Sequence, residues 1–192
     1  SEESATAEEL SLFRNTNGRL QWLAHRSRPD IAFEQNKLAQ RTSDLKVQDL
    51  IAANKLVDYA KTNIELGLYF RKNVVDVSTA CVLAYGDSSF ANMPGEKSQA
   101  GTVMCLTDSP QDVVNGRFDK QLPLSWASFR VKRIVRSTLA AEAYSISEAM
   151  EHAQFLRQFL QELYMPHATE LKDIETSSTA RPSSSTWPAI PT

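Results

Sequence analysis

The sequence predicts an α+β fold in which a small helical segment precedes a three-stranded antiparallel sheet, with one long helix packed against that sheet. Two observations lead to this prediction. Apolar residues recur at helical spacing over residues 10–66 and again from Ser137 to about Tyr164. Between these stretches lie short runs typical of strands, separated by polar connections that contain Gly or Pro.

The first 66 residues are expected to hold three helices. The acidic stretch 1–9 is predicted to be disordered, and residues 10–66 are predicted to form a helical connection segment. A first helix is expected over roughly Glu8 to His25. A second begins at Pro29, whose missing N–H suits the first helical position. A third begins near Lys46, because apolar residues then recur along one helix face as far as Ile64.

The predicted sheet domain spans residues 67–165. Four runs read as strands, "LGLYF", "STACVLAYG", "AGTVMCLTD" and "LPLSWASF", and their connections have the length of an antiparallel meander. The long helix that follows carries an apolar stripe, which we expect to lie against the sheet. Residues 166–192 are rich in Ser, Thr and Pro and are predicted to be a disordered tail.

Composition and charge exclude several classes of protein. The chain has 192 residues, 42% of them hydrophobic, and a formal net charge of −2, so any basic surface that binds nucleic acid must be local. No apolar run reaches the length of a membrane helix, and we expect an intracellular protein of the cytoplasm or nucleus without membrane contact. Cys81 and Cys105 lack metal-ligand spacing and are predicted to be buried thiols.

The apolar run before "YGDSSFAN" leads directly into Asp87. Alternation places Cys81, Leu83 and Tyr85 on the same strand face as Asp87, at what we expect to be the end of a central strand. An aspartate followed by two serines is a common way to leave a strand, so the residue reads either as a turn former or as a catalytic group.

A second acid, Glu142, lies in the second turn of the long helix. It falls at the edge of the apolar stripe, so we expect its carboxylate to lean toward the sheet. One interpretation is that its aliphatic part packs on the core while its carboxylate is exposed to solvent. The other is that Glu142 is the partner of Asp87 in a site for a divalent metal ion.

Five motifs in order resemble the Pol polyproteins of copia-type retrotransposons. "GRLQWLAHRSRPDIAFEQNKLAQ" resembles the segment that closes their reverse transcriptase region, and residues 28–33 match its core. "YGDSSFAN", "EKSQAGTVMCL", "LSWASFR" and "STLAAEAYS" resemble successive motifs of their ribonuclease H domain, with Asp87 on the first aspartate of the motif Ser-Asp-Ala-Asp-Trp-Ala and Glu142 on the glutamate of Ser-Ser-Thr-Glu-Ala-Glu-Tyr.

The resemblance implies a ribonuclease H-like mixed sheet flanked by helices. It also implies that Asp87 and Glu142 are catalytic and metal ligands for two Mg²⁺ ions, which in that family cleave the RNA strand of an RNA–DNA hybrid. The expected partners are such a hybrid and the remainder of the polyprotein or reverse transcriptase.

The sequence also departs from the family. The third aspartate, expected in the next strand within an Asp-Asn pair, is not recognisable; Asp173 is a weak candidate that comes early and lacks the Asn. Ser89 and Phe90 replace the second aspartate and the tryptophan of the first motif. The C-terminal part of the fold is therefore expected to be missing and cleavage impaired. The alternatives are an inert structural or hybrid-binding remnant, and an unrelated domain for protein contacts.

A basic stretch, "FRVKRIVR", connects the last predicted strand to the long helix. Arg130, Lys132, Arg133 and Arg136 read either as contacts to the phosphates of a hybrid near the metal site or as a solvated rim.

Overall fold

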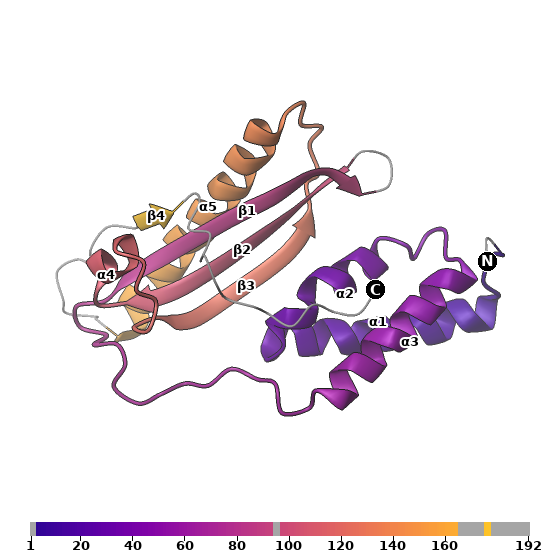
Figure 1. Ribbon diagram of the computed structural model, residues 1–192, viewed down its shortest axis with the longest axis horizontal. Helices are drawn as coiled ribbons and strands as arrows, with labels where there is room; N and C mark the ends of the chain where they lie inside the picture. The colour runs from indigo at the N-terminus through magenta and orange to yellow at the C-terminus, as the bar shows by residue number, and fades with distance from the viewer. Residues whose placement is uncertain (1–2, 94–96, 165–174, 178–192) are drawn as a thin grey trace. The chain divides into compact units, whose positions relative to one another are not determined.

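The computed structural model describes residues 3–93, 97–164 and 175–177. Contacts between residues divide these into two compact units, which we call the helical unit, residues 3–69, and the sheet unit, residues 70–177 (Figure 1). The boundary between the two units lies between residues 69 and 70.

The helical unit contains α1 (Ala7–Arg26), η1 (Pro29–Ile31), α2 (Ala32–Ala39) and α3 (Val47–Thr62) (Figure 1). Pro29 stands at the first position of η1, as predicted. The three helices enclose one apolar core, formed by Phe13, Leu20, Ala24, Ile31, Leu38, Leu45, Ala53 and Leu56. Because this core has members from every helix, the helical unit is held together by burial of apolar surface.

The start of the chain is ordered from Glu3, so the prediction of a disordered segment over residues 1–9 is wrong for residues 3–9. Thr6 is the N-cap of α1: its hydroxyl accepts the Glu9 N–H at 3.2 Å, and the Glu9 carboxylate accepts the Thr6 N–H at 2.8 Å. This capping box satisfies two free backbone donors at once. The Ala5 N–H also donates to the Leu45 carbonyl at 3.0 Å, which ties the segment to the residues before α3.

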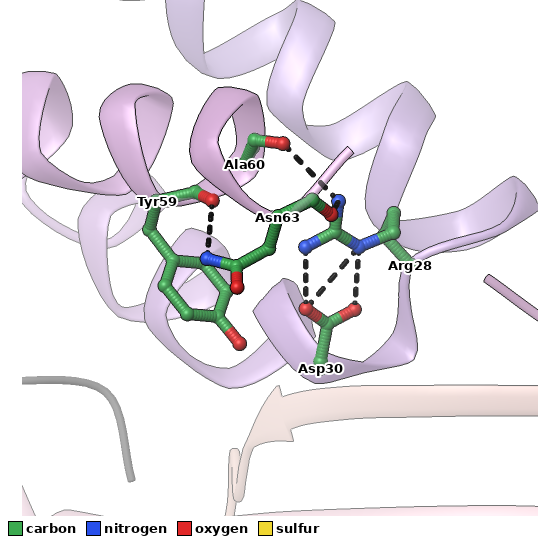
Figure 2. A network of polar contacts seen from close by, with 5 residues as sticks. All are labelled: Arg28, Asp30, Tyr59, Ala60 and Asn63. Carbon is green, nitrogen blue, oxygen red and sulfur yellow. Dashed lines mark hydrogen bonds and ion pairs between the residues drawn. The ribbon is translucent and has the colours of Figure 1, made fainter. Parts of the chain in front are cut away.

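Arg28 joins the turn after α1 to the end of α3 (Figure 2). Its guanidinium is buried and forms an ion pair with Asp30, with Nη2 2.7 Å from Oδ2. Nη1 donates to the carbonyls of Ala60 and Asn63 at 3.3 and 3.0 Å. These carbonyls at the C-terminus of α3 lack helical partners, and a cation there also complements the helix dipole.

The sheet unit is built on four strands in the order β3-β2-β1-β4 (Figure 1). The strands are β1 (Cys81–Met93), β2 (Lys97–Thr107), β3 (Leu122–Arg130) and β4 (Glu175–Ser177). β1, β2 and β3 form the expected antiparallel meander, and β4 lies parallel to β1 on its other edge. Two helices complete the unit, the short α4 (Pro110–Val114) and the long α5 (Thr138–Tyr164).

Helices cover the two faces of the sheet unequally. Ala149 and Ala153 of α5 pack against Val82 and Ala84 on one face. On the other face, Val113 of α4 packs with Leu83 and Cys105. Both cysteines are buried and neither is in a disulfide, as predicted. Within the described part of the chain, no helix has the length and apolar character needed to cross a membrane.

Three expectations for the predicted sheet domain and the tail need correction. The run "LGLYF" forms no strand: Tyr69 and Phe70 are exposed there, because strand propensity alone does not make a strand without a neighbouring strand to pair with. Asp87 does not end β1, because pairing with β2 carries the strand on to Met93. The tail expected over residues 166–192 lies outside the described residues except at Glu175–Ser177, which form β4 instead of a disordered segment.

Candidate nuclease site

Asp87 lies in the interior of β1 and is exposed to solvent. The pairing between β1 and β2 is uninterrupted from Cys81 to Ser89, and Asp87 stands opposite Gly101. Side chains alternate along such a strand. Because Val82 and Ala84 face α5, Asp87 belongs with Leu83 and Tyr85 on the face away from α5. Its Oδ1 accepts the N–H of Ser88 at 2.9 Å, which fixes the carboxylate beside its own backbone.

Gly86, the residue before Asp87, is the point of closest approach between β1 and α5. A Cβ atom at this position would lie 2.8 Å from the carbonyl oxygen of Ser145 and 3.0 Å from the nitrogen of Ile146. Only glycine therefore allows α5 to lie at this distance from the strand. Ser145 is itself fully buried at this contact, and its hydroxyl donates to the Glu142 carbonyl at 2.8 Å.

Glu142 is half-buried in α5, three residues before Ser145. α5 runs antiparallel to β1, with its first turns near the C-terminal half of the strand (Figure 1). Three helical residues span about 4.5 Å, and strand residues advance about 3.3 Å each. The contact between Gly86 and Ser145 therefore brings Glu142 level with Asp87 and Ser88 along the strand. Asp87 and Glu142 therefore lie at the same position along β1. Asp87 is on the face of the sheet away from α5, whereas Glu142 approaches from the face that α5 covers.

The edge of β1 near these acids is uncovered in the described part of the chain. β4 pairs with β1 only from Leu83 to Tyr85, so it stops two residues before Asp87. The side chain of Ser88, on the α5 face beside Gly86, has a buried hydroxyl oxygen for which the described residues offer no hydrogen-bond partner. A buried hydroxyl without a partner is costly, and such atoms commonly face a bound water or ion.

The described residues supply no third acid at this place. They contain no group of three or more His, Cys, Asp or Glu side chains arranged to hold a metal ion. Glu175 belongs to β4, but its backbone pairs with Leu83, four residues before Asp87, which corresponds to about 13 Å along the strand. Asp173, the weak candidate from the sequence, lies outside the described residues.

The four predicted basic residues lie at the same end of the sheet as Asp87. We call residues 130–136 the basic loop; it begins at the end of β3 and leads into α5. Arg130 pairs with Gln99, which pairs with Ser89, so its Cα lies about 12 Å from that of Asp87 by strand geometry. All four cationic side chains are exposed.

Arg133 lies close to the first turns of α5. The pKa of Tyr144 is raised, chiefly by a hydrogen bond to Glu148, while the positive charge of Arg133 acts in the opposite direction. The basic loop is therefore near the helix that carries Glu142, and Arg130 at its start is held by the β2–β3 ladder.

Sequence reasoning missed two residues of this site, Gly86 and Ser88. A signal for Gly86 was present, because a glycine inside an apolar strand often marks a close approach of another backbone. Nothing in the sequence signals the buried hydroxyl of Ser88, since its burial depends on where α5 crosses β1.

The chain is similar to two retrotransposon Pol polyproteins. It is 28% identical over 155 residues to the retrovirus-related Pol polyprotein from transposon RE1 of Arabidopsis thaliana, a match that covers 79% of the chain. It is 26% identical over 152 residues, again 79% of the chain, to the retrovirus-related Pol polyprotein from transposon RE2 of the same plant. These matches span 9% of the length of each relative. No protein-family model matches the chain, and no solved structure does.

Proposed function

We propose that the sheet unit of this chain is a ribonuclease H-like module. The proposal starts from the similarity of the chain to retrotransposon Pol polyproteins, which agrees with the resemblance found in its motifs. The substrate of the module would be the RNA strand of an RNA–DNA hybrid, and its cofactor Mg²⁺. The observation that carries the proposal is the similarity to retrotransposon Pol polyproteins over 79% of the chain. The contact between Gly86 and Ser145 brings Glu142 level with Asp87 along β1, although Asp87 lies on the face of the sheet away from α5. The helical unit, with its Arg28–Phe33 motif, is proposed to be the end of the reverse transcriptase region.

The topology of the sheet unit supports this proposal. Three antiparallel strands are followed by a helix that crosses the sheet and then by a fourth strand parallel to the first. The central strand carries one acid and the crossing helix carries the other. Side chains on a strand and a packed helix hold their positions better than side chains on loops, which suits residues that must share a cation.

The donor atoms at this edge are of the kind that Mg²⁺ binds. Mg²⁺ prefers oxygen ligands, keeps several waters and is often held by one or two carboxylates together with a phosphate of the substrate. Because Asp87 and Glu142 lie on opposite faces of the sheet, they could share an ion only around the edge of β1, which the described residues leave uncovered beyond Tyr85 and where the Ser88 hydroxyl also lies. The bound metal would stabilise the charge that develops on the phosphate and lower the pKa of its water. The basic loop would hold the flanking phosphates.

A second candidate function is a hybrid-binding remnant without nuclease activity. It is favoured by the absence, within the described residues, of a third acid near Asp87. Two carboxylates give fewer ligands than a two-metal site requires, so cleavage by this chain is expected to be impaired. In either case the remainder of the polyprotein is a proposed partner.

The proposal is tested by incubating the whole chain with a labelled RNA–DNA hybrid and Mg²⁺. Asp87→Asn and Glu142→Gln remove one charge each with little change in shape, and each is expected to reduce metal-dependent cleavage at least about 100-fold. Glu162→Gln near the other end of α5 is the matched control and should cleave normally.

Two results decide between the candidates. Metal-dependent cleavage that is lost in both site variants supports the nuclease. If the unaltered chain binds the hybrid and does not cut it, the remnant stands. Cleavage that persists in Asp87→Asn and Glu142→Gln would show that neither residue acts in the reaction.

A further inference from the structure

The chain contains two Asn–Gly pairs, Asn17–Gly18 and Asn115–Gly116, and the structure places them in opposite surroundings. An Asn followed by Gly is prone to deamidation, because the glycine has no Cβ to hinder attack of its nitrogen on the Asn side chain. The attack also requires the backbone to leave its regular conformation, so it proceeds in segments that open locally. The fold therefore decides which of the two pairs reacts.

The pair at Asn17 is protected by the core of the helical unit. Asn17 lies inside the 20-residue helix α1 and is 8% exposed. Its Oδ1 accepts a hydrogen bond from Nε2 of the buried Gln35 at 3.4 Å. Deamidation here would require α1 to open in its middle, against the packing of all three helices, so we expect it to be slow.

The pair at Asn115 lies in an exposed turn. Asn115 is the C-cap of α4, a helix of five residues, and Gly116 follows with a φ of 75°, the left-handed conformation that ends many helices. The Gly116 N–H donates to the Val113 carbonyl at 2.9 Å, and the Arg117 N–H donates to the Asp112 carbonyl at 2.8 Å. These are the two bonds of a Schellman motif.

This turn has little to hold it closed. Of the five residues of α4, all of which the structure describes, Val113 is the one that is buried. Val114 is 70% exposed, and Asn115 itself is exposed. A segment with so few buried contacts opens at small cost, and opening frees the Gly116 nitrogen from its hydrogen bond.

We propose that Asn115 is a site of spontaneous deamidation, and that isoaspartate formed at this position releases α4 from the sheet and uncovers the Cys105 thiol. The Gly116 nitrogen attacks Cγ of Asn115. A bond forms between these two atoms, the bond from Cγ to Nδ2 breaks, and ammonia leaves with the amide hydrogen. Water then opens the succinimide ring and returns a proton to the Gly116 nitrogen. Opening at Cγ gives aspartate, and opening at the backbone carbonyl carbon gives isoaspartate.

Isoaspartate changes the length of the backbone where α4 ends. The chain then runs through the former side chain and contains one more carbon atom, so the two hydrogen bonds of the turn cannot both keep their geometry. Val113 is the residue of α4 that packs with Leu83 and Cys105. Cys105 is 6% exposed. Without α4 its thiol would meet solvent and become reactive, because burial no longer disfavours the thiolate. This inference does not depend on the proposed nuclease.

The first measurement compares the two Asn–Gly pairs within one chain. The whole folded chain is aged at pH 8 and physiological temperature, and its peptides are analysed by mass spectrometry, with isoaspartate detected by a protein isoaspartyl methyltransferase. Deamidation at Asn115 is expected to be at least about tenfold faster than at Asn17. In guanidinium chloride the two rates should become similar, because both residues precede glycine. Equal rates in the folded chain, or no reaction at Asn115, would overturn the inference.

The second measurement follows the consequence on the same molecules. Trypsin cleaves after Lys97 and Arg117, so Asn115 and Cys105 are recovered in one peptide. The aged, folded chain receives a short pulse of thiol reagent before digestion. Peptides that carry isoaspartate at position 115 should be labelled on Cys105 at least about tenfold more than peptides with the intact Asn. Equal labelling of the two would show that α4 keeps its place, and would overturn the release of α4.

Two variants separate the possible causes. Asn115→Gln keeps an exposed amide but closes a ring one atom larger and therefore more slowly, so its Cys105 labelling should not rise with age. A rise equal to that of the unaltered chain would overturn the inference. Freshly prepared Asn115→Asp adds the charge without lengthening the backbone, and its Cys105 should be labelled as slowly as in the unaged chain. Labelling as fast as in the isoaspartate form would overturn the role of the longer backbone.

Discussion

Replacement of Gly86 by alanine tests the contact on which the candidate site depends. The added Cβ would lie 2.8 Å from the Ser145 oxygen and 2.9 Å from its carbonyl carbon. Carbon atoms pack at about 3.5–4.0 Å, so α5 would have to retreat by roughly 0.5–1 Å. Overpacking of this kind costs about 1–3 kcal/mol, and the obstacle is backbone, which cannot turn aside as a side chain can.

Gly101→Ala is the matched control in the neighbouring strand. Its nearest obstacle would be the Ala127 oxygen at 3.9 Å, an ordinary contact, so the change should be neutral or stabilise by up to about 1 kcal/mol through the unfolded chain. The two variants should therefore differ by about 1–4 kcal/mol. For a unit of this size, each kcal/mol corresponds to a shift of about 4–8 °C in melting temperature.

Urea unfolding gives the free energy of each variant, and hydrogen exchange of peptides from β1 and α5 shows whether the loss is local to the contact. We expect faster exchange in both elements for Gly86→Ala and in neither for Gly101→Ala. Free energies of unfolding that agree within about 0.5 kcal/mol would refute the close approach of α5 to β1. The placement of Glu142 level with Asp87 would then lose its support.

Three further predictions concern stability and reactivity. Arg28→Met should destabilise the helical unit by about 3–5 kcal/mol in urea unfolding, because it leaves the largely buried Asp30 carboxylate, 12% exposed, without its partner. Asp30→Asn combined with it should recover part of the loss, and equal losses in the single and double variants would contradict the ion pair. The pKa of Glu9 is lowered, chiefly because its carboxylate accepts the Thr6 backbone N–H and secondly the Thr6 hydroxyl, so this contribution to stability is present above the ordinary value of 4.5 and is lost as pH falls below it. Glu9→Gln should therefore lower the free energy of unfolding more at pH 7 than at acid pH, measured by urea unfolding across pH, and a loss that does not depend on pH would contradict the ionised capping box. Burial raises the pKa of Cys105 to about 11, so its thiol should resist a thiol reagent at pH 8 in the folded chain and react on unfolding. For the same reason, the stability of the folded chain should fall as pH rises above the ordinary thiol pKa of 9.0. Rapid labelling of Cys105 in the folded chain, detected by mass spectrometry, would contradict this prediction.

The class of fold was predictable because periodicity is a local property. The three helices of the helical unit, the meander of β1 to β3 and the long α5 all follow from the spacing of apolar residues. The errors occurred where structure depends on distant partners. "LGLYF" has the residues of a strand but no strand beside it, and Glu175–Ser177 has few residues typical of a strand yet pairs with the exposed edge of β1. The capping box of Thr6 and Glu9 was readable and was overlooked beside the acidic composition.

The candidate site was predictable only in part, for a related reason. Alternation and helical spacing place Asp87 and Glu142 on their own elements, but they say nothing about how far along β1 the helix α5 crosses. That offset is set by Gly86, where the missing side chain lets the backbone of Ser145 come close. A shift of α5 by one turn, about 5.4 Å, would carry Glu142 past Asp87 by more than one strand residue. The glycine before the aspartate is thus part of the candidate site, although it has no side chain to offer a metal ion or a substrate, because it sets where along β1 Glu142 stands relative to Asp87.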